Sequence, residues 1–233
     1  SAPFIMGSYY FHEFITSSEL FSIKEVKING NNRLLDKDIH DLIFFKGHER
    51  IYSINLKEIR DNILENFIVK DVVVKRKIPD ILIIDLIERE TFAYMLYNKE
   101  YYEIDIEGYV FKKIEETELK NLPIILGVMK IDGGIVLGSV SDSPKIKKSL
   151  DILKLVLVSD VAKCFNITKV DIENMRQIVL YTDKAIKIQL GHDGINKKLE
   201  NLSLLLLDNK EDLERISDID LRFGGVIVKH SKN

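Results

Sequence analysis

The pattern of apolar and polar positions predicts that the first third of the chain forms a strand, two helices and two more strands. Residues 21–29 carry β-branched side chains interspersed with charged ones, which is typical of a half-buried strand. Asp36 and Asn55 each precede apolar residues at helical spacing, so each is a candidate N-cap at the start of a helix. Residues 69–76 and 81–88 then have strand character, and the second run is apolar on both faces, as expected inside a sheet.

The rest of the chain predicts a second unit that consists mostly of strands. A hairpin is expected at 101–112, because Glu107-Gly108 supplies a turn between two apolar runs. Ser143-Pro144 predicts a helix start, with proline at the first helical position. The remaining expected elements are a hairpin at 178–190, a helix at 195–206 and a closing hairpin of strands 219–223 and 226–228. The fold class is therefore α+β, with a second mixed α/β domain whose sheet is mainly antiparallel.

Composition excludes several classes of protein. The chain has 233 residues, of which 45% are hydrophobic and 30% charged, so it has enough apolar material for a packed core and is not disordered as a whole. Its 34 basic and 37 acidic residues give a net charge of −3, which argues against a general nucleic-acid binder. Cys164 is the only cysteine, so an internal disulfide and a multi-cysteine zinc site are both excluded.

The chain contains no run that could serve as a targeting or membrane segment. No stretch approaches the roughly 18 apolar residues that a membrane span needs. Residues 1–8 lack the basic start of a signal peptide and contain Met6-Gly7-Ser8, which is typical of an expression scar. We therefore expect this sequence to be a soluble piece of a longer protein.

The residues that could support catalysis or metal binding are few, and each has a simpler structural interpretation. His192-Asp193 lies between an expected strand and an expected helix, where Asp193 more simply caps the helix. Cys164 lies among apolar residues and is expected to pack as a small hydrophobe. Asp105 and Glu107 resemble a carboxylate pair, but beside Gly108 they are more simply turn residues. The sequence thus predicts no catalytic residue, metal site or cofactor, and it favours a binding or structural module.

Glycine and lysine clusters give equally weak signals. Gly133, Gly134 and Gly138 lack the Lys-Ser/Thr ending of a phosphate-binding loop. The basic run 75–77 is expected to be a solvated strand end or a protected sheet edge. Three lysines near the start of the helix at Ser143 are expected to be solvated rather than to contact lipid: Lys145, Lys147 and Lys148.

Four ordered motifs in the second unit carry a resemblance to a known family. They are Asp105-x-x-Gly108-x-x-Phe111, Leu122-Pro123-x-x-x-Gly127, Ile188-Gln189-Leu190-Gly191 and Asp220-Leu221-Arg222-Phe223 followed by Gly225-Val226-Ile227-Val228. The first unit adds Val26-Lys27-Ile28-Asn29-Gly30-Asn31, the run from Val72 to Pro79, and Glu88-Arg89. From residue 21 to about 229 the chain resembles the FtsQ/DivIB family of bacterial cell-division proteins.

The resemblance implies a domain organisation and a location. Residues 9–20 would be a juxtamembrane segment, 21–90 a POTRA domain and 91–233 a C-terminal β domain. The full-length protein would be anchored in the cytoplasmic membrane by one N-terminal span that is missing here. This region would lie outside the cytoplasm (in the periplasm), with the protein enriched at the division septum.

The resemblance also implies a non-catalytic scaffold that recruits and links proteins of the divisome. Its partners would be FtsB/DivIC-like and FtsL-like division proteins, together with other divisome members. We expect binding by strand addition, in which the final strand accepts a partner strand through its free backbone groups. The candidate partner-binding residues are Phe223, Gly225, Val226 and Val228, with Ile227 on the other face. Alternatively, these residues complete the sheet and the chain's tail covers the edge.

Two rival functions remain at this point. A POTRA-containing outer-membrane assembly or secretion component would share the first unit, but such a protein continues into strands that form a membrane barrel. An enzyme built on the second unit would need a pocket with converging titratable groups, for example around His192 and Asp193.

Overall fold

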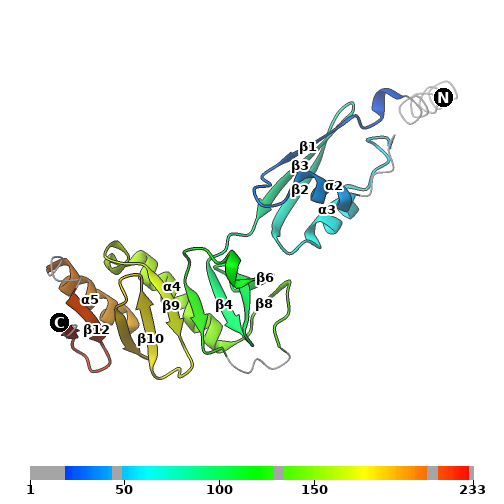
Figure 1. Ribbon diagram of the computed structural model, residues 1–233. Helices are drawn as coiled ribbons and strands as arrows, with labels where there is room; N and C mark the ends of the chain where they lie inside the picture. Colours follow the sequence, from blue (N-terminus) through cyan, green and yellow to red (C-terminus); the bar gives the residue numbers. More distant parts are fainter. Residues whose placement is uncertain (1–18, 44–48, 129–133, 209–214, 231–233) are drawn as a thin grey trace, which may run out of the picture. The chain divides into compact units, whose positions relative to one another are not determined.

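The computed structural model describes residues 19–43, 49–128, 134–208 and 215–230. The expected expression scar at 1–8 and most of the expected juxtamembrane segment, 9–18, lie outside the described residues, as does Gly133. The chain divides into two compact units, Ser1–Arg89 and Glu90–Asn233 (Figure 1). The described part of the chain contains no helix long and apolar enough to span a membrane.

The first unit packs two helices against a three-stranded sheet. Strand order is β1-β3-β2, with β1 parallel and β2 antiparallel to β3. The central position of β3 agrees with its apolar sequence, since alternate side chains are fully buried and the others are mostly half-buried. The elements are η1 (Glu19–Phe21), β1 (Glu25–Asn29), α2 (Asp36–Ile43), α3 (Leu56–Leu64), β2 (Val69–Lys77) and β3 (Ile81–Glu88).

Local sequence signals explain where the two helices begin. The Asn55 side chain accepts hydrogen bonds from the backbone N–H groups of Lys57 and Glu58, so it caps α3 as predicted. Asp36 is the first residue of α2 rather than its cap. The apolar faces of both helices then close a core with β2 and β3.

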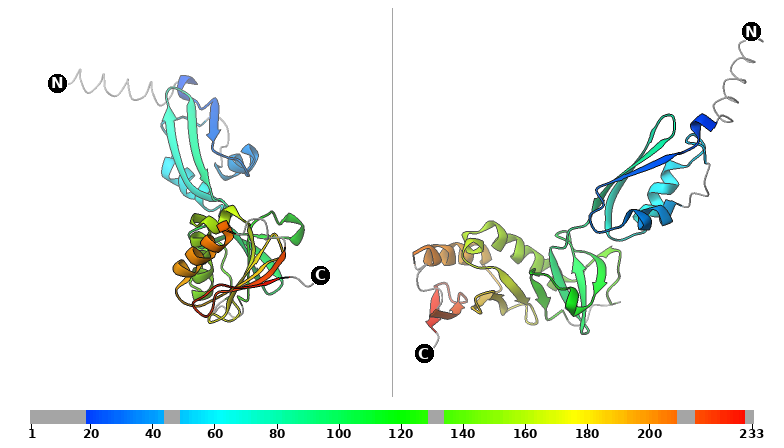
Figure 2. Two further views of the ribbon diagram at one scale, coloured as in Figure 1. Left: turned by 90° about the vertical axis from the view of Figure 1, so that its left-hand side faces the viewer. Right: turned by 45° about the horizontal axis from the view of Figure 1, so that its top comes forward.

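The second unit is a ten-stranded sheet with α4 and α5 on one face (Figure 2). Strand order is β13-β12-β11-β10-β9-β7-β4-β5-β6-β8. Among the described pairs six are antiparallel and three are parallel, so the prediction of a mixed, mainly antiparallel sheet is confirmed. The strands are β4 (Ala93–Tyr97), β5 (Glu100–Ile104), β6 (Tyr109–Ile114), β7 (Ile124–Leu126), β8 (Ser139–Val140), β9 (Ile167–Asp171), β10 (Ile178–Thr182), β11 (Lys187–Gly191), β12 (Ile216–Asp220) and β13 (Ile227–His230).

The helices of this unit follow the predicted starts closely. Helix α4 (Pro144–Val158) begins directly after Ser143 with proline at its first position, although the Ser143 hydroxyl makes no capping hydrogen bond. Helix α5 (Ile195–Asp208) buries Ile195, Leu199 and Leu202 against the sheet. Short 3₁₀ turns η2 (Glu116–Glu118) and η3 (Asp160–Lys163) complete the unit.

The closing hairpin differs from its predicted bounds. Strand β12 begins at Ile216 and ends at Asp220, so Phe223 lies in the turn and not in a strand as predicted. The cause is local: the Asp220 carboxylate accepts a hydrogen bond from the backbone N–H of Arg222, which bends the chain away from the ladder. Pairing resumes at Ile227, one residue later than the sequence suggested.

Candidate partner-binding edge of the sheet

Strand β13 is one of the two ends of the ten-stranded sheet. It pairs with β12 on one side only, and the strand order places no described strand on its other side. Alternate residues of such an edge strand direct their backbone N–H and C=O groups away from the sheet. The strand therefore offers backbone groups to which a further strand can bond.

A row of apolar side chains runs across seven strands and ends on β13. The paired residues are Met95, Ile125, Val170, Leu180, Ile188, Ile219 and Val228, one from each successive strand. The first six are fully buried, whereas Val228 is half-buried and packs against their core. Val228 is thus the half-buried end of a continuous apolar row.

The candidate binding residues are divided between the two faces of the sheet. Val226 and Val228 pack against the core on the helix side, while the side chain of Ile227 is 51% exposed on the other side. Phe223 is 77% exposed at the turn, and Gly225, two residues further along the turn, is also exposed. An added strand would meet Val228 on one face and Ile227 on the other, with Phe223 at the end of the edge.

The turn that carries Phe223 is held by a short ion pair. The Arg222 guanidinium donates to both carboxylate oxygens of Asp220, at 3.0 Å from Nε and 2.6 Å from Nη2. These hydrogen bonds, more than any other interaction, hold the pKa of Asp220 below its usual value. The same guanidinium lies 5.1 Å from the centre of the Phe223 ring, within cation–π range. Asp220, Arg222 and Phe223 therefore form one connected group.

The end of β11 is hydrogen-bonded both to α5 and to the start of this turn. Lys198 Nζ donates to the Leu190 carbonyl at 2.9 Å and to the Asp193 carboxylate at 3.0 Å. The Leu221 backbone N–H donates to the Gln189 carbonyl, which ties the turn to β11. Asp193, which the sequence suggested as a helix cap, forms an ion pair with Lys198 of the same helix.

The Asp-x-x-Gly motif forms a turn, as its residues suggest. The buried Asp105 side chain accepts hydrogen bonds from the backbone N–H groups of Glu107 and Tyr109, each at 2.9 Å. Gly108 donates its N–H to the Asp105 carbonyl with φ at +89°. Phe111 then enters the strand as a buried residue. Asp105 is therefore a turn residue of the β5–β6 hairpin.

The Leu-Pro motif ends at a glycine that the packing requires. Gly127 has φ at +78°, and a Cβ there would overlap the backbone of Glu173. Lys145 Nζ donates to the carbonyls of both Gly127 and Glu173 at 2.8 Å. The expectation that Lys145 is simply solvated is therefore wrong, because its ammonium group joins the segments that follow β7 and β9.

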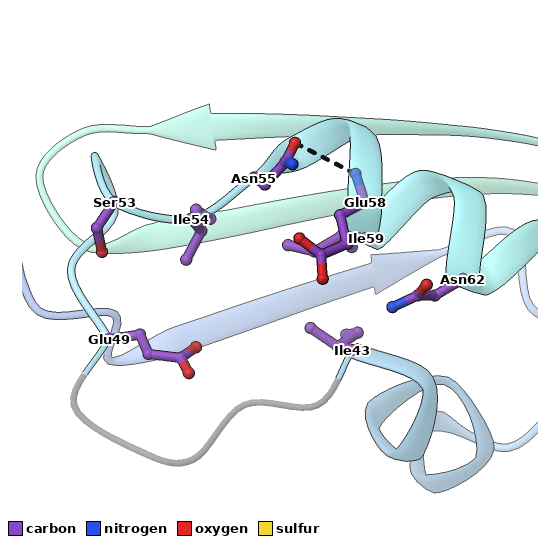
Figure 3. Close-up of a pocket in the computed structure, with 8 residues that line it drawn as sticks. All are labelled: Ile43, Glu49, Ser53, Ile54, Asn55, Glu58, Ile59 and Asn62. Carbon is purple, nitrogen blue, oxygen red and sulfur yellow. Dashed lines mark hydrogen bonds between the residues drawn. The ribbon is translucent and has the colours of Figure 1, made fainter.

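Three surface hollows lie away from His192 and Asp193, the pair around which an enzyme would need a pocket. A pocket of about 270 Å³ in the first unit lies beside α2 and α3, with Glu49, Glu58 and Asn62 around it (Figure 3). The Asn55 side chain is committed to capping and the Ser53 hydroxyl donates to the Arg50 carbonyl. The other hollows have volumes of about 280 and 440 Å³; the first is lined mostly by apolar residues, and the second by apolar and polar residues in equal number. None of the three includes His192 or Asp193.

Metal-ligating groups do not gather within the described ranges. No cluster of three or more His, Cys, Asp or Glu side chains there could hold a metal ion. Cys164 is partly buried against the core, in agreement with its predicted packing role.

Sequence reasoning missed the Asp220–Arg222 pair and the apolar row. The spacing Asp-x-Arg directly before an aromatic residue and two glycines is the signal that could have predicted a held turn. The row depends on strand order, which the sequence does not reveal.

Comparisons with known proteins agree with this architecture. Residues 21–89 match the model of the FtsQ-type POTRA domain, and residues 93–222 match the model of the C-terminal domain of cell division protein FtsQ/DivIB. The chain is similar to cell division protein DivIB of Clostridium tetani, with 28% identity over 82% of this chain and 72% of that protein. It is also similar to cell division protein FtsQ of Syntrophotalea carbinolica, with 25% identity over 89% of this chain and 73% of that protein. Since the C-terminal model alone matches more than half of its length, the chain belongs to the FtsQ/DivIB family of bacterial cell-division proteins.

Proposed function

We propose that this chain is the extracytoplasmic part of a non-catalytic divisome scaffold, anchored in the cytoplasmic membrane by one N-terminal span and enriched at the septum. Its partners are FtsB/DivIC-like and FtsL-like division proteins, bound by strand addition to β13. The observation that carries this proposal is the apolar row that ends at half-buried Val228 on an edge strand. The rival function, an outer-membrane assembly or secretion component, is disfavoured because residues 93–222 match a division-protein domain.

Strand addition at this edge has a definite chemistry. The partner residue opposite Val228 points to the helix side, where it extends the apolar row and leaves water. On the other face Lys229 lies opposite Asp218, so an acidic partner residue beside Lys229 would continue the alternation of charge. Backbone bonds supply affinity, and these two side-chain positions supply selectivity.

Calorimetry with soluble extracytoplasmic segments of FtsB/DivIC-like and FtsL-like proteins tests the proposal. Phe223→Ala is expected to weaken binding at least tenfold, because an exposed aromatic residue beside the edge is a typical hot spot. Since Phe223 is mostly solvent-exposed, the variant should unfold at the wild-type temperature. Val226→Lys should also abolish binding, but Val226 contacts the core, so its unfolding must be measured in parallel.

Val140→Ala is the matched control, since Val140 is an exposed residue of β8 at the opposite end of the sheet. Its affinity should equal that of the wild type. Unchanged affinity in Phe223→Ala and in Val226→Lys would show that β13 is not the binding edge.

A further inference from the structure

A groove between α4 and α5 is a second apolar surface, separate from the β13 edge. It has a volume of about 440 Å³ and lies between the C-terminal end of α4 and the whole length of α5. Its lining consists of Leu155, Val158, Ser159, Asp160, Asn196, Leu199, Glu200, Ser203, Leu204 and Leu207. Half of these residues are large and aliphatic.

Three of the five aliphatic residues that line this groove are strongly exposed. Val158 is 83% exposed, Leu204 60% and Leu207 40%. Their neighbours along the same helices, such as Val156 and Leu206, are buried in the core. An apolar patch that is contiguous and rimmed by polar residues marks an interaction surface more often than scattered exposed residues do.

The shape and the walls of the groove select one kind of occupant. The lining extends along α5 from Asn196 to Leu207, which is about 16 Å at 1.5 Å per residue. Both walls are helices, whose interior backbone groups are already bonded within the helix, so they cannot extend a sheet. A helix has its backbone groups bonded internally, so its apolar face can enter the groove without losing backbone hydrogen bonds, and a helix suits these walls better than an added strand does.

The charge of the lining adds a second requirement. Two acidic residues, Asp160 and Glu200, belong to the lining, and none of its residues is basic. Asp160 pairs with Lys163, whereas Glu200 makes no ion pair within the described part of the chain. A basic side chain on the occupant would complement Glu200.

We propose that the α4–α5 groove binds an amphipathic helix of a partner protein. The helix presents apolar residues at i, i+3 or i+4, and i+7 to Val158, Leu204 and Leu207, and a lysine or arginine to Glu200. This contact is independent of strand addition at β13 and provides the scaffold with a second attachment site.

Site-specific photocross-linking in the full-length protein, in its own cells, tests the identity of the occupant. A photoreactive phenylalanine analogue replaces Val158 or Leu204, and Leu157 in the control. Leu157 is 63% exposed and adjacent to Val158, but it lines the hollow of about 280 Å³ and not this groove. We expect both groove positions, and not the control, to cross-link to one face of a single helical segment of another protein. Cross-links to an extended segment, to a second copy of this chain or within the chain itself would overturn the proposal. The absence of any cross-link from the two groove positions would also overturn it.

Affinity measurements on the cross-linked segment, made as a synthetic peptide, test the chemistry. Leu204→Glu should weaken binding at least tenfold, and Leu157→Glu should change it less than twofold. Glu200→Lys should weaken binding several-fold, and replacing the basic peptide residue by glutamate should restore it. The peptide should gain helical circular dichroism when bound.

Phe223→Ala separates this proposal from strand addition. It should leave the affinity for this peptide unchanged while weakening the β13 partner. Equal binding of the peptide by Leu204→Glu and by the wild type would reject the groove as its site.

Discussion

The two edge strands of the ten-stranded sheet differ in length. They also differ in the side chain with which a buried row of paired residues ends on each of them. At one end, a buried row of Ala93, Ile104 and Val110 ends on Ser139 of the two-residue strand β8. At the other end, the seven-strand row ends on Val228 of the four-residue strand β13. A short edge with a polar terminus offers an added strand few backbone bonds and no apolar contact. Of the two edges in the described part of the sheet, β13 is therefore the better suited to extend the core into a partner, which is the basis of the proposal.

The largest expected effect comes from placing a charge at the end of the apolar row. Val228→Asp should reduce partner binding at least a hundredfold, because the added strand would bury a carboxylate. It should also lower the free energy of unfolding by about 1–3 kcal/mol, since Val228 is half-buried against the core. Calorimetry and urea unfolding measure the two quantities. The comparison of edges fails if Ser139→Asp at β8 impairs binding as much.

A second prediction compares the aspartates that hold the turn beside each edge. Asp105→Ala should lower the free energy of unfolding by about 1–3 kcal/mol, because two backbone N–H groups lose their acceptor in a buried turn. Asp220→Ala should destabilise the protein by a similar amount. Only Asp220→Ala should also weaken partner binding, because only its turn positions Phe223. If Asp105→Ala weakened partner binding equally, the loss of affinity in both variants would come from a general loosening of the sheet and not from the position of Phe223.

A third prediction concerns acid pH. The ion pair with Arg222 lowers the pKa of Asp220 in the folded state, so its stabilisation is complete above the unfolded-state pKa of about 3.9. That contribution is lost as the pH falls through the lower pKa of the folded state. Urea unfolding from pH 7 to pH 2 should show a smaller acid-side loss of stability in Arg222→Ala than in the wild type. Identical pH profiles would mean that this pair does not stabilise the turn.

Local signals predicted much of the fold but little of the candidate edge. Asn55, Ser143-Pro144 and the Asp105–Gly108 turn act within a few residues of themselves, and the structure places elements where they indicate. Lys145 was misjudged because its partners are carbonyls 18 and 28 residues away. The strand assigned to 219–223 was too long because Leu221 and Phe223 continue an apolar alternation that the Asp220–Arg222 bond interrupts. Edge strands are defined by the order of all ten strands, and no short pattern contains that order.

The smallest expected effect comes from removing one side-chain hydrogen bond at each edge strand. It tests whether partner binding depends on the order of β13 or on the stability of the fold. The Ser217 hydroxyl donates to the Lys229 carbonyl of β13 at 3.2 Å, and the Ser139 hydroxyl of β8 donates to the Val136 carbonyl at 2.9 Å. Each alanine substitution should cost about 0.5 kcal/mol or slightly more, as for one exposed neutral hydrogen bond. Ser217→Ala should also speed hydrogen exchange of the β13 amides and weaken partner binding two- to threefold, because a looser strand loses more entropy when it pairs. Ser139→Ala should leave both quantities unchanged, since the proposal places the partner strand on β13 and not on β8. Equal changes in the two variants would show that partner binding depends on the stability of the whole sheet and not on the order of β13.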